Sequence, residues 1–203
     1  MVPMISSSLK PAVTRLINPV ARLAVAAGLT PNAITILGAC GVLASAAWFY
    51  PREEFFWGTL AIVFFALSDL FDGAMARLSK SGASPWGGFL DSTIDRITDS
   101  AITIAVIIPL IAADDPLSYL GLLILVSGFL IPYIRAKAES FGINCSIGIA
   151  ERTERLVIML TAIGFHGLGV PYVLACGFWL LSILGVVTVL QRVYVVRRGL
   201  ATR

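Results

Sequence analysis

The sequence predicts an all-helical integral membrane protein, with six transmembrane helices preceded by an N-terminal interfacial amphipathic helix. Of its 203 residues, 58% are hydrophobic and only 13% are charged, and the mean hydropathy is +0.89. A soluble domain of this size carries more charge. Apolar segments near the ~20 residues that a helix needs to cross a bilayer recur along the chain. We therefore expect a single membrane domain over residues 1–203.

The first predicted element is a helix over residues 5–27 that lies on the membrane surface. Apolar side chains recur there at helical spacing, while Lys10, Arg15 and Arg22 interrupt the apolar run. That pattern is typical of an interfacial amphipathic helix, and Pro11 is placed near its start. The alternative is a disordered basic tail.

Six apolar segments follow and predict a transmembrane bundle over residues 33–196. The first ends before Pro51, and an Asp114-Asp115-Pro116 turn separates the third from the fourth. The fifth is short, so its polar start must lie near the lipid headgroups. The predicted helices are 33–50, 56–79, 87–113, 116–139, 153–167 and 171–196.

Lysine and arginine set the expected orientation. With six spans, the loops on one side hold only Arg52, whereas the other loops and both chain ends collect the remaining basic residues. Basic residues mark the cytoplasmic side of a membrane protein. Both termini are therefore expected in the cytoplasm, in a chain that lies in the cell (plasma) membrane.

Carboxylates interrupt the second and third apolar segments, at Asp69, Asp72, Asp91 and Asp95. Each ionised side chain at bilayer depth costs roughly 3 kcal/mol on insertion scales, so these charges must be neutralised. The first pair is spaced i, i+3 and the second i, i+4, so each pair lies on one side of its helix. Because the two helices are expected to be antiparallel, Asp72 and Asp91 should be nearly level. The spacing predicts a four-carboxylate pocket that opens toward the cytoplasm.

A set of oxygen donors without nearby histidine or cysteine suits Mg²⁺ or Mn²⁺ better than zinc. Two such ions would balance four aspartates, as in two-metal chemistry. One alternative is a set of buried Asp–Arg ion pairs with Arg77 and Arg96 as partners. Another is a cation or proton transporter, although the sequence has no convincing internal repeat of the kind that many transporters contain.

The segment from Asp69 to Arg77, read as D-L-F-D-G-A-M-A-R, is followed by Gly87, Asp91 and Asp95. This pattern resembles the signature of the CDP-alcohol phosphotransferase family, D-x2-D-G-x2-A-R and then G-x3-D-x3-D. The resemblance implies an enzyme that transfers a phosphatidyl group from CDP-diacylglycerol to an alcohol and releases CMP. It also implies a homodimer, bound to membrane lipid, with no nucleic-acid partner.

The resemblance further implies a role for each matching residue. All four aspartates are expected to bind metal, and Asp95 is also expected to be the general base. Asp99 continues the face of Asp91 and Asp95 outside the signature. We interpret it as a polar group that either supports the metal ligands from behind or joins two helices, with a catalytic role as the alternative. Asn32 is either a nucleotide contact or a plain helix cap. The residues expected to bind the CDP-lipid are Asn32, Asp69, Asp72, Gly73, Ala76, Arg77 and Gly87.

Basic residues near the cytoplasmic helix ends predict the acceptor site, because arginine binds phosphate oxygens in a bidentate manner. The alternative is an ordinary positive flank of the membrane. A choline or ethanolamine acceptor is disfavoured, since cations repel such alcohols. The candidates are Arg135, Lys137, Arg152, Arg155 and Arg192.

The segments Y-I-R-A-K-A-E and E-R-T-E-R are most similar to the actinobacterial phosphatidylinositol-phosphate synthases within that family. The resemblance implies inositol 1-phosphate as the acceptor. Glycerol 3-phosphate, giving phosphatidylglycerophosphate, is the alternative acceptor.

Overall fold

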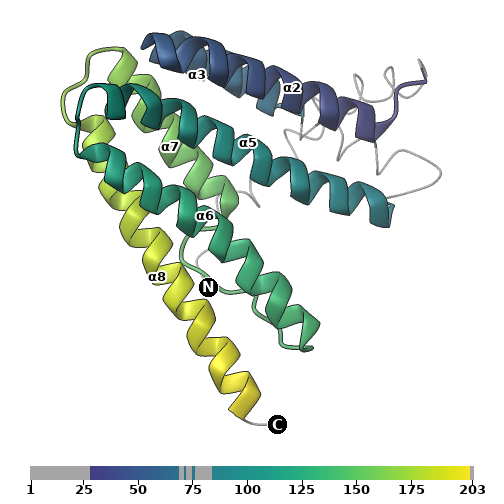
Figure 1. Cartoon of the computed structure of the whole chain (residues 1–203). Helices are drawn as coiled ribbons and strands as arrows, with labels where there is room; N and C mark the ends of the chain where they lie inside the picture. Colours follow the sequence, from purple (N-terminus) through teal and green to yellow (C-terminus); the bar gives the residue numbers. More distant parts are fainter. Residues whose placement is uncertain (1–27, 69–70, 72–74, 76–83, 202–203) are drawn as a thin grey trace, which may run out of the picture. The chain divides into compact units, whose positions relative to one another are not determined.

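The computed structural model describes residues 28–68, 71, 75 and 84–201, and the regular structure in those residues is entirely helical (Figure 1). This confirms the predicted all-helical class for the described part of the chain. The described elements are α2 (Pro31–Phe49), the 3-10 helix η1 (Tyr50–Arg52), α3 (Phe55–Ala66), α5 (Pro85–Ala112), α6 (Leu117–Ser140), α7 (Arg152–Gly167) and α8 (Val173–Ala201).

The helix starts follow from short capping sequences. Proline is the first residue of α2 and of α5, where its missing N–H costs no helical hydrogen bond. Thr30 Oγ1 accepts a bond of 3.2 Å from the N–H of Ala33 in α2, and Ser84 Oγ accepts one of 2.9 Å from Gly87 in α5. Thr30 therefore caps α2, and the alternative that Asn32 is the helix cap is wrong.

Two predicted elements fall wholly or partly outside the described residues. The interfacial helix expected over 5–27 lies entirely outside them. The second predicted span, 56–79, corresponds to α3 at Phe55–Ala66, while most of its second half is outside the described part. The other observed helices agree with the predicted ranges within a few residues, except that α8 continues to Ala201.

Three helical segments in the described part are long and apolar enough to cross a membrane: Pro31–Arg52, Leu117–Ser140 and Val173–Ala201. The helix Phe55–Ala66 is apolar but shorter. These segments are consistent with a membrane protein. Six transmembrane spans stay a prediction.

The chain divides into two compact units. The first includes the described residues of Met1–Val42 and Ile62–Asp95, and the second includes Leu43–Ala61 and Arg96–Arg203. Within the first unit, glycines on α2 allow close packing against the chain around the end of α3. A Cβ at Gly38 would overlap the Ser68 side chain, and one at Gly41 would overlap the ring of Phe65. The residue directly before the Asp69 of the signature is thus held tightly against α2.

Close approach of small residues also builds the second unit, where α8 packs against α6 and α7. A Cβ added at Gly177 of α8 would lie 2.4 Å from the Cβ of Ala162 in α7. One added at Gly185 of α8 would lie 2.6 Å from the hydroxyl oxygen of Ser127 in α6. Small residues at these crossings allow the dispersion contacts that hold helices together in lipid.

A small apolar cluster supports the segment that joins α6 to α7. Ala138, Ile143 and Cys145 are buried there against Val195 and Val196 of α8. α6 ends when the chain turns through Gly142 at φ 66°, and the N–H of Ile143 then bonds back to the carbonyl of Ala138 at 3.0 Å. The turn directs residues 143–151 along α8 toward the start of α7.

Gly177→Ala is expected to lower the thermal unfolding temperature in detergent, because the new methyl group has no space against Ala162. Overpacking of this kind costs about 1–3 kcal/mol. Gly128→Ala in α6 is the matched control, since a Cβ there meets no described atom within 4 Å. It should leave the unfolding temperature unchanged or raise it, because alanine favours helix over glycine. Equal effects of the two changes would contradict the proposed packing.

Candidate functional site

Two of the four signature aspartates lie in the described part, both on α5. Asp91 is exposed and Asp95 is half-buried, and their i, i+4 spacing on a continuous helix puts both carboxylates on one side. Asp69 and Asp72 lie outside the described residues, as do Gly73, Ala76 and Arg77. No group of three histidine, cysteine or acidic residues that could hold a metal is found in the part that is described.

Asn32 and Gly87, both expected to bind the CDP-lipid, lie close together in the first unit. A Cβ added at Gly87 would lie 3.3 Å from the amide oxygen of Asn32 and 3.2 Å from Ser84 Oγ. The start of α2 and the start of α5 therefore meet at a glycine with little room for a side chain. The fold therefore brings Asn32 and Gly87 together, although they are far apart in the sequence.

A pocket with cationic and apolar walls lies in the second unit. Arg152 and Arg155 of α7 line it, which places two of the five predicted acceptor residues together. Residues of α5, α6 and α8 complete the lining: Arg96, Asp99, Ser100, Ile102, Thr103, Ile124, Leu125, Gly128, Phe129, Leu156, Met159 and Leu181.

An ion pair joins α5 to α7 inside this pocket. Arg152 donates from Nε to Asp99 Oδ2 at 3.2 Å and from Nη2 to Asp99 Oδ1 at 3.1 Å. The two side chains are only 27% and 30% exposed. Parallel N–H···O bonds of this type fix the plane of a guanidinium as well as its position. Asp99 is thus an interhelical polar group, as the sequence suggested.

Arg155 is held by the segment that directly precedes its own helix, α7. Its Nη1 donates to the carbonyl oxygen of Ala150 at 3.0 Å, and its side chain is half-buried in the pocket wall. Ala150 itself is buried. The segment before α7 therefore contributes directly to the position of this guanidinium.

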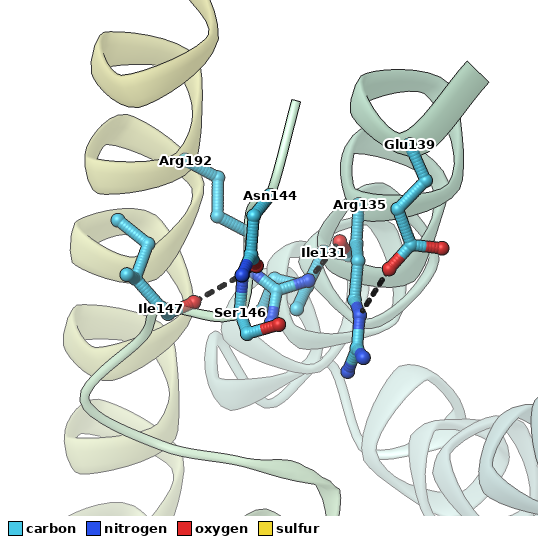
Figure 2. Close-up of polar contacts among 7 residues, drawn as sticks. All are labelled: Ile131, Arg135, Glu139, Asn144, Ser146, Ile147 and Arg192. Atoms are coloured by element: carbon cyan, nitrogen blue, oxygen red, sulfur yellow. Dashed lines mark hydrogen bonds and ion pairs between the residues drawn. The ribbon is translucent and has the colours of Figure 1, made fainter. Parts of the chain in front are cut away.

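Arg192 of α8 is buried and binds backbone carbonyls of two other segments (Figure 2). Its Nε donates to Ile147 at 2.9 Å, and its Nη1 donates to Ile131 of α6 at 2.5 Å. A cation with only 7% of its surface exposed needs such partners, because water cannot solvate it. Arg192 thereby ties the α6–α7 segment to α6 and α8.

Arg135 and Lys137 are exposed at the end of α6 and do not line the pocket. Arg135 pairs with Glu139 on its own helix at 2.9 Å, and both side chains are about half exposed, at 51% and 53% (Figure 2). The Lys137 ammonium lies 4.8 Å from the centre of the Phe141 ring. The five predicted acceptor residues thus occupy three different surroundings.

Arg96, which the sequence offered only as an ion-pair partner for the aspartates, lies in the pocket wall with Asp99 and Ser100. Thr103 lines the wall as well. The signal was present, because positions 96, 99, 100 and 103 repeat at the i, i+3, i+4, i+7 spacing of one helix face.

The described part of the signature, Gly87, Asp91 and Asp95, lies on α5 in the first unit, and the pocket lined by arginines lies in the second. The family model described as CDP-alcohol phosphatidyltransferase matches residues 28–191. The chain belongs to this family, which confirms the family indicated by the signature.

Within the family, the chain is similar to proteins called phosphatidylinositol phosphate synthase. The one from Streptomyces avermitilis is 42% identical over 194 residues, which cover 91% of this chain and 79% of that protein. The one from Mycobacterium tuberculosis is 39% identical over 190 residues, covering 91% and 87%.

Two crystal structures of the M. tuberculosis protein resemble this chain closely. The structure with CDP-DAG bound has a TM-score of 0.84 at 39% identity and covers 90% of this chain and 94% of that one. The complex with manganese and citrate also has a TM-score of 0.84, at 38% identity, with 89% and 88% covered.

Arg192→Gln is expected to speed amide hydrogen exchange across residues 143–150. The guanidinium that joins Ile147 of this segment to Ile131 of α6 is then missing. We expect an increase of about 10- to 150-fold, since losing a charge-assisted bond costs about 1.5–3 kcal/mol. Arg197→Gln, at an exposed position of the same helix, is the control and should leave the exchange of this segment unchanged. Unchanged exchange in Arg192→Gln would contradict the tethering role.

Proposed function

We propose that the protein is a phosphatidylinositol-phosphate synthase type of CDP-alcohol phosphotransferase. It transfers the phosphatidyl group of CDP-diacylglycerol to inositol 1-phosphate, producing phosphatidylinositol phosphate and CMP. The observation that carries the proposal is the 39% identity, over 90% of the chain, with a phosphatidylinositol phosphate synthase whose structure holds CDP-DAG. The half-buried arginines of the pocket agree with an acceptor that already carries a phosphate.

In this proposal, the donor is held by residues of the signature and by the start of α2. Asn32 and Gly87 form the described part of the CDP-lipid site, and Asp69, Asp72, Gly73, Ala76 and Arg77 complete it. The tight contact at Gly87 supports a role in which backbone, rather than a side chain, borders the nucleotide.

The four aspartates are proposed to hold divalent metal, because an all-oxygen donor set suits Mg²⁺ or Mn²⁺. Asp91 and Asp95 fit this role, since their carboxylates share one side of α5. Two ions would balance the charge of Asp69, Asp72, Asp91 and Asp95. Bound there, the metal supplies positive charge against the charge that develops on the phosphates.

Asp95 is proposed as the general base. The acceptor hydroxyl oxygen forms a bond to the phosphorus that carries the diacylglycerol, and the bond from that phosphorus to the bridging oxygen breaks. The hydroxyl proton passes to the Asp95 carboxylate, and CMP leaves with the bridging oxygen. A half-buried carboxylate can take this proton when the hydroxyl lies within hydrogen-bond reach.

The acceptor phosphate is proposed to bind Arg152 and Arg155, which share one pocket wall. Arg135 and Lys137 would supply further positive charge at the exposed end of α6. Arg192 would contribute to acceptor binding in two ways: by holding the α6–α7 segment in place and by contacting the phosphate directly.

We also propose how the protein is oriented in the membrane and that it assembles as a dimer. The chain would cross the cell membrane six times, with the active site and both termini in the cytoplasm. The soluble acceptor would then reach the site from the cytoplasm, where positive residues gather. The protein would work as a homodimer.

The assay follows CMP release by purified protein with CDP-diacylglycerol and Mg²⁺ or Mn²⁺, offering inositol 1-phosphate, glycerol 3-phosphate and free inositol separately. We expect release with inositol 1-phosphate, none with free inositol, and loss of release when a chelator removes the metal. Asp95→Asn should lower the rate by at least about 10²-fold, which is the usual contribution of a positioned general base.

Each other outcome points to a different conclusion. Preference for glycerol 3-phosphate would make the protein a phosphatidylglycerophosphate synthase, and use of free inositol alone would refute the phosphate pocket. Charge flux across liposomes without CMP formation would replace the enzyme by a cation or proton transporter.

Gly87→Ala is expected to raise the KM for CDP-diacylglycerol, because the methyl group would press against Asn32 and Ser84. An increase of roughly five- to tenfold corresponds to about 1–1.4 kcal/mol of lost binding. Gly88→Ala is the adjacent control, since a Cβ there meets no described atom within 4 Å. A wild-type KM in both variants would remove Gly87 from the donor site.

A further inference from the structure

The pocket of the second unit holds a carboxylate among arginines, which is unexpected in a site for an anionic acceptor. Asp99 shares the lining with Arg96, Arg152 and Arg155. A negative charge at this place repels an incoming phosphate and weakens the field of the arginines. Its presence therefore calls for a compensating role in the site.

The geometry of the ion pair suggests that role. Asp99 receives two bonds from Arg152, at 3.2 Å from Nε and 3.1 Å from Nη2, so the guanidinium has one defined plane. Arg152 is the first residue of α7, where the helix provides only part of its packing surroundings. A long side chain at such a position loses much rotational freedom when it binds a ligand, unless another group already holds it.

Repulsion between like charges is a second reason why Arg152 needs a carboxylate partner. Arg152 and Arg155 lie three residues apart in the first turn of α7, so both face the positive end of the helix dipole. Arg96 brings a further cation from α5. Without a counter-charge on α5, repulsion by the other arginines would favour positions of the Arg152 guanidinium farther from them. Asp99 is the carboxylate in the pocket lining that opposes this repulsion.

We propose that Asp99 is a positioning residue for the acceptor phosphate, holding Arg152 beside Arg155 so that both guanidinium groups are in place before the acceptor arrives. The inference rests on the proposed function and deepens it. Pairing with Asp99 engages only one edge of the planar guanidinium, so it is compatible with phosphate binding by the same residue. The repulsion of the phosphate by Asp99 is outweighed by the pre-organisation of Arg152.

The experiment compares acceptor and donor kinetics in Asp99→Asn, which keeps the side-chain shape and removes the charge. We expect the KM for inositol 1-phosphate to rise about tenfold, while the KM for CDP-diacylglycerol stays near the wild-type value. Asp99→Glu keeps a carboxylate and should restore much of the acceptor KM. An acceptor KM in Asp99→Asn equal to or below that of the wild type would overturn the proposal.

A charge swap separates positioning from a purely structural link between α5 and α7. In the double variant Asp99→Arg with Arg152→Asp, the ion pair can re-form and the unfolding temperature should return toward wild type. The acceptor KM should stay raised, because the cation no longer projects from α7 beside Arg155. Recovery of the acceptor KM in the swap would show that the pair is only a structural link, and would overturn the proposal.

A binding measurement keeps this inference distinct from the proposed function. If the wild-type protein forms no CMP with any phosphorylated polyol, the proposed function fails, and inorganic phosphate then serves as the probe. Phosphate should raise the unfolding temperature of the wild type more than that of Asp99→Asn, because binding to the native state stabilises it. Equal or greater stabilisation of Asp99→Asn would overturn the positioning role.

Discussion

An ionised side chain among apolar helices is stable only where protein groups take the place of its water, and this requirement organises the described second unit. Arg152 receives a carboxylate from another helix, Arg155 a carbonyl from the preceding segment, and Arg192 carbonyls from two segments. The partners lie on α5, on α6 and on the segment between α6 and α7, so solvating the charges also connects α5, α6, α7 and α8. The cost of an unpaired charge is greatest at Arg192, which is buried, and smaller at Arg152 and Arg155, which are half-buried.

Small residues make these polar connections possible. Gly177 and Gly185 allow α8 to approach α7 and α6 closely, and Arg192 of α8 donates to the carbonyl of Ile131 in α6. The same principle operates in the first unit, where Gly38 and Gly41 hold α2 against the chain that leads into the signature. Close packing and charge solvation are therefore two parts of one solution, since lipid supplies neither water nor a hydrophobic driving force between helices.

Local sequence signals predicted the helices well but assigned polar side chains less reliably. The prolines at the starts of α2 and α5 and the turn at Asp114 act within a few residues, so they can be recognised without the fold. The cap of α2 was misassigned although its signal was local, because Pro31 as the first helical residue already makes Thr30, rather than Asn32, the capping position. The acceptor candidates illustrate the limit of local signals. All five carry positive charge near helix ends, but Arg135, Lys137 and Arg155 have partners within five residues, whereas Arg152 and Arg192 have partners far away in the sequence.

The sequence by itself determined the membrane character, the positions of most helices and, through the spacing from Asp69 to Asp95, the family. These properties depend on composition and on local periodicity, both of which can be read within short stretches of the sequence. Tertiary structure alone decided that Asn32 lies beside Gly87, that Arg152 pairs with Asp99, and that Arg192 holds the α6–α7 segment. The physical reason is that a buried charge takes whichever partner the packing of several helices brings within hydrogen-bond distance.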